Sequence, residues 1–190
     1  MSHLPATWKP LFIYNIYQEP EDNLLSSADW AAYKASYTAA AKVTRAYGVS
    51  LPWVEWQEWT TDPYNTMGWD LAHFTPPAAD FGGVLWSLFE YGEKDRLGAQ
   101  VPRITAAMAR YAPGKPWGLM AAAYTLEHAP YTSAQETAQA AWLAKAYNMT
   151  QAAGSTKFAW YNYLFPGTGG ASGESRIELN PAALAEMRRL

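Results

Sequence analysis

The chain has 190 residues and a net charge of −3, with 49% apolar and 16% charged residues. This length and composition suit one domain with a buried core and exclude a disordered chain. A slightly acidic balance without any basic block argues against nucleic acid as a partner. No apolar run is long enough to cross a membrane and no signal-peptide pattern is visible, so we expect no membrane partner and assign no compartment.

The sequence offers no pattern for a metal or a cofactor. Cysteine is absent, which excludes disulfides and thiolate metal sites. The three histidines, His3, His73 and His128, are far apart and have no partner at ligand spacing. Phosphate loops and dinucleotide fingerprints are missing as well, so we expect no metal and no cofactor.

Five short apolar runs predict strands, at residues 11–17, 49–56, 81–89, 117–124 and 157–164. They are almost continuously hydrophobic, which is typical of parallel strands that are covered on both faces.

Helical patterns lie between these runs. Ser26 and Asp29 resemble a capping box, and the helix that follows is expected to end at Gly48. Three more helices are predicted: one over 101–111, one that Ser133 opens with Glu136 and that ends near Gly154, and one that begins at Asn180-Pro181. Alternating strands and helices predict an α/β fold with a parallel sheet.

Residues 57–80 lack a helical stripe and are rich in aromatic residues. Long irregular connections in a compact domain are usually functional or disordered, and this one is too aromatic for a simple linker.

The first predicted strand is followed by Gln18-Glu19-Pro20-Glu21-Asp22. Reactive groups in parallel α/β barrels lie at the carboxyl ends of strands. A strand that ends in Glu-Pro resembles the clan A glycoside hydrolases, and "QEPED" looks most like the "HHEPED" of the mannanase-like family 26. The resemblance places Glu19 at the position of the acid/base glutamate.

Three later segments are similar to the sixth, seventh and eighth strands of that family, namely residues 78–92, 112–125 and 154–165. The resemblance implies an α/β fold that is a partial or incomplete (β/α)8 TIM barrel of about five βα units with parallel strands. Residues 1–190 would then form a single glycoside-hydrolase-like barrel domain that lacks the first three units.

The sequence departs from the family pattern in three ways. Gln18 replaces a histidine, and Ala121 stands where the family has its nucleophilic glutamate. Five strands cannot close a barrel, so an edge would be exposed at residues 11–17. The chain is then a fragment, a reduced open variant, or a protein whose open edge is covered by self-association or by a partner chain.

Glycoside hydrolysis needs two carboxylates on either side of the scissile bond. We expect Glu19 to be the proton donor and Glu58 or Glu127 to replace the missing nucleophile. Glu55 and Glu90 also lie at the ends of predicted strands. The alternative for each of these residues is a solvated charge on a loop or at a strand end.

Sugar rings pack on indole and phenol faces, so a carbohydrate cleft needs aromatic residues near its rim. We expect about half of the six aromatic candidates named next to be buried in the core rather than to contact a sugar. With Gln18, the candidate substrate-binding residues are Trp56, Trp59, Trp69, Trp86, Trp160 and Tyr161.

The sequence therefore predicts a glycoside-hydrolase-like protein that acts on a polysaccharide, a β-mannan or a related β-glycan, with a carbohydrate as its ligand. The alternative is a catalytically inactive barrel remnant that serves as a glycan-binding or structural module, for example in a phage or a cell envelope. Fold resemblance by itself does not decide between them.

Overall fold

The computed structural model describes residues 13–18, 20–61, 70–91, 96–125, 130–160 and 176–190, together with residues 7, 9, 68, 164–165 and 173–174. The chain divides into two compact units, Met1–Trp86 with Arg103–Trp117, and Ser87–Pro102 with Gly118–Leu190. The prediction of a single domain over 1–190 stays a prediction.

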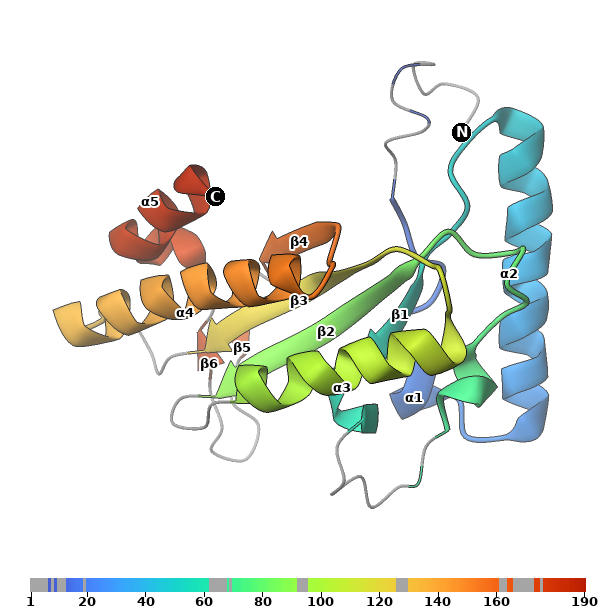
Figure 1. The fold of residues 1–190 in the computed structure, drawn as a ribbon, viewed down its shortest axis with the longest axis horizontal. Helices are drawn as coiled ribbons and strands as arrows, with labels where there is room; N and C mark the ends of the chain where they lie inside the picture. Colours follow the sequence, from blue (N-terminus) through green and yellow to red (C-terminus); the bar gives the residue numbers. More distant parts are fainter. Residues whose placement is uncertain are drawn as a thin grey trace. The chain divides into compact units, whose positions relative to one another are not determined.

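Four parallel strands form the main sheet in the order of the sequence (Figure 1). They are β1 (Val54–Gln57), β2 (Val84–Tyr91), β3 (Trp117–Thr125) and β4 (Lys157–Trp160). In the register of β3 with β4, Gly118 faces Lys157 and Leu119 faces Phe158. A separate antiparallel pair joins β5 (Leu164–Phe165) to β6 (Gly173–Glu174).

The four later predicted strands are present with shifted ends, but the first differs from the prediction. This strand was predicted at residues 11–17. The structure describes residues 13–18, and they form no strand. The Trp53 N–H donates to the Tyr14 carbonyl at 2.8 Å, and the Ser50 N–H donates to the Lys9 carbonyl at 3.3 Å. The segment therefore runs beside the residues that lead into β1, and these two hydrogen bonds are too widely spaced to count as a ladder.

In the first unit, α2 (Ser27–Tyr47) has the ends that the sequence predicts. The Ser26 side chain accepts the Asp29 N–H, the Ser26 N–H donates to the Asp29 carboxylate, and Gly48 ends the helix with φ of 64°. The buried face of α2 carries Tyr33, Tyr37 and Ala41 at four-residue spacing. The described part of this unit also contains the short helices α1 (Pro20–Asn23), η2 (Glu58–Thr61) and η3 (Leu71–Phe74).

Two tryptophans form the centre of the first unit's core. Trp56 in β1 and Trp86 in β2 are fully buried and meet edge to face, with ring centroids 5.3 Å apart. Trp56 also meets Tyr111 of α3 (Arg96–Tyr111), and its indole N–H donates to the Phe74 carbonyl at 3.2 Å. One face of β1 is therefore sealed by aromatic rings, and the buried indole nitrogen has its acceptor.

In the second unit, α4 (Ser133–Ala152) covers β3 and β4 (Figure 1). Trp142 packs against both Tyr124 and Trp160, with ring centroids 6.1 and 5.9 Å apart, and Tyr147 packs against Phe158 at 5.7 Å. The capping box of α4 is shifted by one residue from the predicted Ser133 and Glu136, because Thr132 and Gln135 make the reciprocal hydrogen bonds.

The last helix, α5 (Pro181–Arg189), follows η4 (Ile177–Leu179) and is joined to α4 and β3 by buried amides. Asn180 caps α5 through the Ala183 N–H, and its amide donates to the Gln139 side chain at 2.8 Å and to the Glu136 carbonyl at 3.0 Å. Gln139 in turn donates to the Tyr124 carbonyl at 2.9 Å. This chain of hydrogen bonds holds α5 in one register against α4.

Replacement of Asn180 with alanine tests this connection. Asn180→Ala is expected to lower the free energy of unfolding by about 2 to 4 kcal/mol, because it removes a cap and leaves buried acceptors without their donor. Thr132→Ala is the matched control, since it removes an exposed cap of α4 and is expected to cost about 1 kcal/mol. Urea denaturation of the three proteins makes the comparison, and a loss for Asn180→Ala no larger than the control's would contradict this account.

Candidate active site

Strand β1 presents two chemically different faces. All four of its residues are buried, although Glu55 and Gln57 are polar. Successive side chains of a strand point to opposite faces. Since Trp56 packs against Trp86 and Tyr111, Glu55 and Gln57 point to the other side of the sheet.

This polar side of β1 is built from residues far apart in the sequence. The Asn15 amide donates to the Glu55 carboxylate at 2.6 Å, and the Gln57 backbone N–H donates to the Glu21 carboxylate at 3.0 Å. Glu21 and Glu55 are fully buried, and Glu58, the first residue of η2, is 3% exposed. We call Glu21 and Glu55 the acidic cluster.

Glu21 fixes the position of α1 at the end of β1. It is the second residue of this four-residue helix, and its hydrogen bond reaches the last residue of β1. Helix α1 directly follows Glu19 in the sequence. The turn that the sequence singled out is thus held at the carboxyl end of a parallel strand, which is where reactive groups lie in parallel α/β barrels.

Glu58 lies immediately after β1 and is buried rather than solvated. The alternative that it is a surface charge on a loop is therefore wrong. A buried carboxylate at a strand end is costly to keep, so its position is consistent with a function that needs it there. Its role as the second carboxylate stays a prediction.

Two tyrosines of α2 adjoin the cluster. Burial raises the pKa of Tyr37 to about 12, and the Tyr37 hydroxyl donates to the Trp53 carbonyl at 3.0 Å. Burial also raises the pKa of Tyr33 well above its ordinary value, with further contributions from Tyr37 and from the negative charges of Glu21 and Glu55. Both phenols are consequently protonated at neutral pH.

The predicted aromatic residues fall into different environments. Trp56 and Trp86 are enclosed in the core, the alternative that the sequence had left open. Trp59 is half-buried and its indole N–H donates to the Gln57 side chain, while Trp160 is half-buried against Trp142. Gln18, two residues before the first residue of α1, is exposed. The remaining predicted site residues lie outside the described residues: Glu19, Trp69, Glu127 and Tyr161.

Glu90 at the end of β2 is a capping group for a helix. It is 1% exposed, and its two carboxylate oxygens accept the Arg96 N–H, at 3.1 and 3.3 Å, where α3 begins. Burial raises the pKa of this carboxyl. Its hydrogen bonds satisfy the start of α3, which makes Glu90 a weaker catalytic candidate than Glu58.

Sequence reasoning included Glu21 in the segment 18–22 without giving it a role, and it did not single out Asn15. Glu21 lies in a helix of four residues, too short for any periodic pattern, and Asn15 lies in a run that was predicted as a buried strand. Apart from that segment, the sequence signal that marks Glu21 is its place after Pro20, a residue favoured in the first turn of a helix.

Among the described residues, no group of His, Cys, Asp and Glu is arranged to hold a metal ion. In the same part of the chain, no helix combines the length and the apolar character needed to span a membrane.

Comparison with known proteins informs the fold. No protein family and no curated protein matches the sequence. The structure is similar to that of a thermostable mutant of a xylanase (Xyn10A) from Cellvibrio japonicus, with a TM-score of 0.61 and 9% sequence identity. The likeness covers 97% of this chain and 66% of the xylanase chain, so this chain spans slightly less than two thirds of the xylanase's length. It shows the fold, and the predicted partial (β/α)8 barrel with parallel strands is confirmed.

The raised tyrosine pKa values predict a loss of stability in alkali. The unfolded chain loses the Tyr37 proton near its ordinary pKa of 10.0, whereas the folded chain keeps it until about pH 12. The contribution of Tyr37 to the free energy of unfolding is therefore fully present below pH 10. It is lost as the pH rises from 10 to 12, which lowers the free energy of unfolding by about 2 to 3 kcal/mol. Urea midpoints measured across this range are expected to fall less steeply for Tyr37→Phe.

Tyr47→Phe is the control, because Tyr47 lies on the same helix with 48% of its surface exposed. It is expected to follow the unsubstituted protein at every pH. Equal slopes for Tyr37→Phe and Tyr47→Phe would show that the buried phenol is not the cause.

Proposed function

We propose that this chain is a glycoside-hydrolase-like domain that acts on a polysaccharide, a β-mannan or a related β-glycan. The observation that carries the proposal is the buried Glu58 at the carboxyl end of β1, beside the anchored turn that follows Glu19. Glycosidic bond cleavage uses two carboxylates, one that protonates the leaving oxygen and one that attacks the sugar or activates water.

In this proposal Glu19 protonates the glycosidic oxygen. The resemblance to family 26 assigns it that role, and Glu21 supports it by fixing α1 against β1. Glu58 is the second carboxylate, and we prefer it to Glu127 because it is buried directly beyond a strand of the sheet. Glu21 and Glu55 hold the local structure, since each accepts a hydrogen bond from a neighbouring segment.

The likeness to a xylanase supports the same class of activity without identifying the sugar. Trp59 is the described aromatic residue that we place at the rim of the site. It is half-buried, follows Glu58 directly, and its indole is oriented by the Gln57 side chain. A fixed indole face is a suitable platform for the C–H face of a sugar ring.

The proposal is tested by reducing-sugar release from β-mannans, β-glucans, xylan and bacterial envelope glycans. Glu19→Gln and Glu58→Gln are each expected to lower the rate by about 10²- to 10⁴-fold, because glutamine keeps the shape but neither donates a proton nor acts as a carboxylate. Glu178→Gln changes an exposed glutamate of the second unit and is expected to leave the rate unchanged. Activity that survives both site substitutions would overturn the assignment.

A second function is favoured by the composition of β3. This strand carries Ala121 at the position that the resemblance assigns to the nucleophile, and no acidic residue occurs between Trp117 and Thr125. A catalytically inactive glycan-binding module would give no sugar release yet would be retained on one of the same glycans. Neither release nor retention would contradict both functions and favour a structural role.

A further inference from the structure

Gln57, the last residue of β1, makes hydrogen bonds through three different groups. Its backbone N–H donates to the Glu21 carboxylate at 3.0 Å. Its backbone carbonyl accepts the Thr60 hydroxyl at 2.7 Å, and its side-chain carbonyl accepts the Trp59 indole N–H. One residue therefore joins helix α1, which directly follows Glu19 in the sequence, to the short helix η2.

The backbone that carries Glu58 is fixed from both sides. Gln57 and Thr60 are 8% and 9% exposed, so water competes little for the hydrogen bonds between them. The Thr61 hydroxyl donates to the Glu58 carbonyl at 2.7 Å. The turn at the end of β1 is thus held in one conformation before any ligand arrives, which is how precise sites are built.

The hydrogen bond to Gln57 decides what Trp59 can offer a ligand. An indole has one donor and no acceptor, and here the donor is used within the turn. Half-buried Trp59 can therefore contact a sugar only through its ring. Contact with a ring face depends on the orientation of the ring, so the strength of binding depends on the group that fixes this orientation.

Glutamine suits this position because it accepts a hydrogen bond without adding a charge. The neighbouring Glu55 is fully buried and Glu58 is 3% exposed. A carboxylate at residue 57 would add a further charge where acidic side chains are already buried, which is costly. An apolar side chain would leave the indole N–H of Trp59 without its acceptor.

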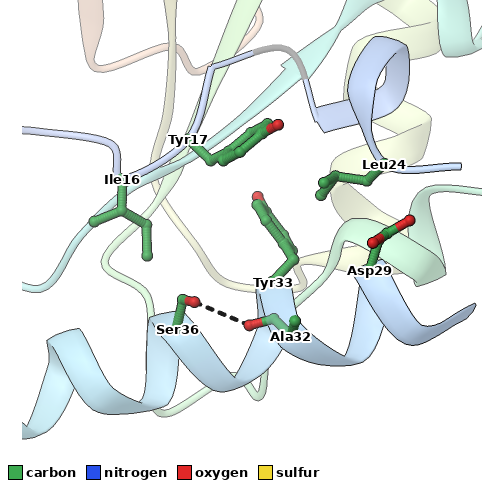
Figure 2. A pocket seen from close by; sticks show the side chains of 7 residues that line it. All are labelled: Ile16, Tyr17, Leu24, Asp29, Ala32, Tyr33 and Ser36. Carbon is green, nitrogen blue, oxygen red and sulfur yellow. Dashed lines mark hydrogen bonds between the residues drawn. The ribbon is translucent and has the colours of Figure 1, made fainter. Parts of the chain in front are cut away.

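The chain is loosely packed on both sides of α1. Tyr17 before this helix and Leu24 after it both line a cavity of about 230 Å³ that faces α2 (Figure 2). Because packing leaves this space unfilled, the hydrogen bond from Gln57 to Glu21 is the contact that we expect to hold α1 at the end of β1.

We propose that Gln57 is a positioning residue for the binding and cleavage of a polysaccharide at this site. Its side chain orients the Trp59 ring for the sugar. Its backbone N–H, through Glu21, holds the helix that follows the proton donor Glu19. The inference rests on the proposed glycosidase function and deepens it, because it gives the sugar platform and the proton donor one common anchor.

Gln57→Met tests the side chain, because methionine keeps an unbranched chain of similar length and lacks a strong acceptor. KM for the glycan that the unsubstituted protein cleaves is expected to rise about three- to tenfold with unchanged kcat, since the platform binds substrate and transition state alike. Trp59→Phe is expected to raise KM as well. The double variant is expected to have the KM of Trp59→Phe, because phenylalanine has no N–H for Gln57 to hold.

Glu21→Ala and Glu21→Gln test the backbone contact. Alanine leaves the Gln57 N–H without its acceptor, and kcat is expected to fall about ten- to hundredfold because the proton donor is misplaced. Glutamine can accept the same N–H through its amide oxygen and is expected to keep most of the activity.

Gln139→Met is the matched control. Gln139 is fully buried and its amide donates to the Tyr124 carbonyl at 2.9 Å, so the substitution removes a comparable hydrogen bond from the second unit. It is expected to lower the urea midpoint and to leave KM and kcat unchanged. A rise in its KM equal to that of Gln57→Met would overturn the proposal, because lost stability would then explain both.

The indole N–H of Trp59 gives a readout that does not depend on activity. Its resonance is the one missing from the spectrum of Trp59→Phe, and it is expected to exchange slowly with solvent in the unsubstituted protein and rapidly in Gln57→Met. Rapid exchange in the unsubstituted protein overturns the proposal even if Gln57→Met does not fold.

Failure of this inference is distinguishable from failure of the proposed function. Sugar release by the unsubstituted protein, together with an unchanged KM in Gln57→Met, additive effects in the double variant or an unchanged kcat in Glu21→Ala, overturns the positioning role and leaves the function in place. No release from the unsubstituted protein overturns the function and, with it, this inference, whatever the exchange of the indole N–H.

Discussion

The burial of acidic side chains on one face of β1 is the constraint on which the first unit depends. A carboxylate removed from water is costly unless other groups supply its hydrogen bonds. Asn15 supplies one to Glu55, and the backbone of Gln57 supplies one to Glu21. These two contacts bring the segment 13–18 and helix α1 to the same strand, although about 40 residues separate each from its partner in the sequence.

The opposite face of β1 makes this arrangement possible. Trp56 and Trp86 fill the space toward α3 and leave no room there for polar groups. Strand alternation then directs Glu55 and Gln57 to the other, also buried, side of the sheet. The tryptophans that looked like candidate sugar platforms contribute instead by fixing which way the acidic residues face. Glu58, just past the strand, is buried as well.

The second unit depends on amides rather than on charges. Asn180 and Gln139 connect the start of α5 to α4 and to the backbone of β3, and the rings of Trp142 and Tyr147 cover β3 and β4. Glu90 uses its carboxylate to satisfy the beginning of α3. Acidic residues at strand ends thus have different structural roles in the two units. For this reason, the position of a glutamate at the end of a predicted strand does not by itself identify it as a catalytic candidate.

The amino-acid sequence by itself determined the order of the four strands of the main sheet and of helices α2 to α5, the capped ends of α2 and the capped start of α5, and the parallel α/β class, because these follow from local patterns of apolar, capping and turn residues. It also named Glu58 as a candidate, on the ground that it follows a strand. Only the tertiary structure decided that Glu58 and Glu21 are buried, that Trp56 and Trp86 belong to the core, and that Glu90 caps a helix. Burial and hydrogen-bond partners arise from segments distant in the sequence, and no local pattern encodes which of these segments will meet.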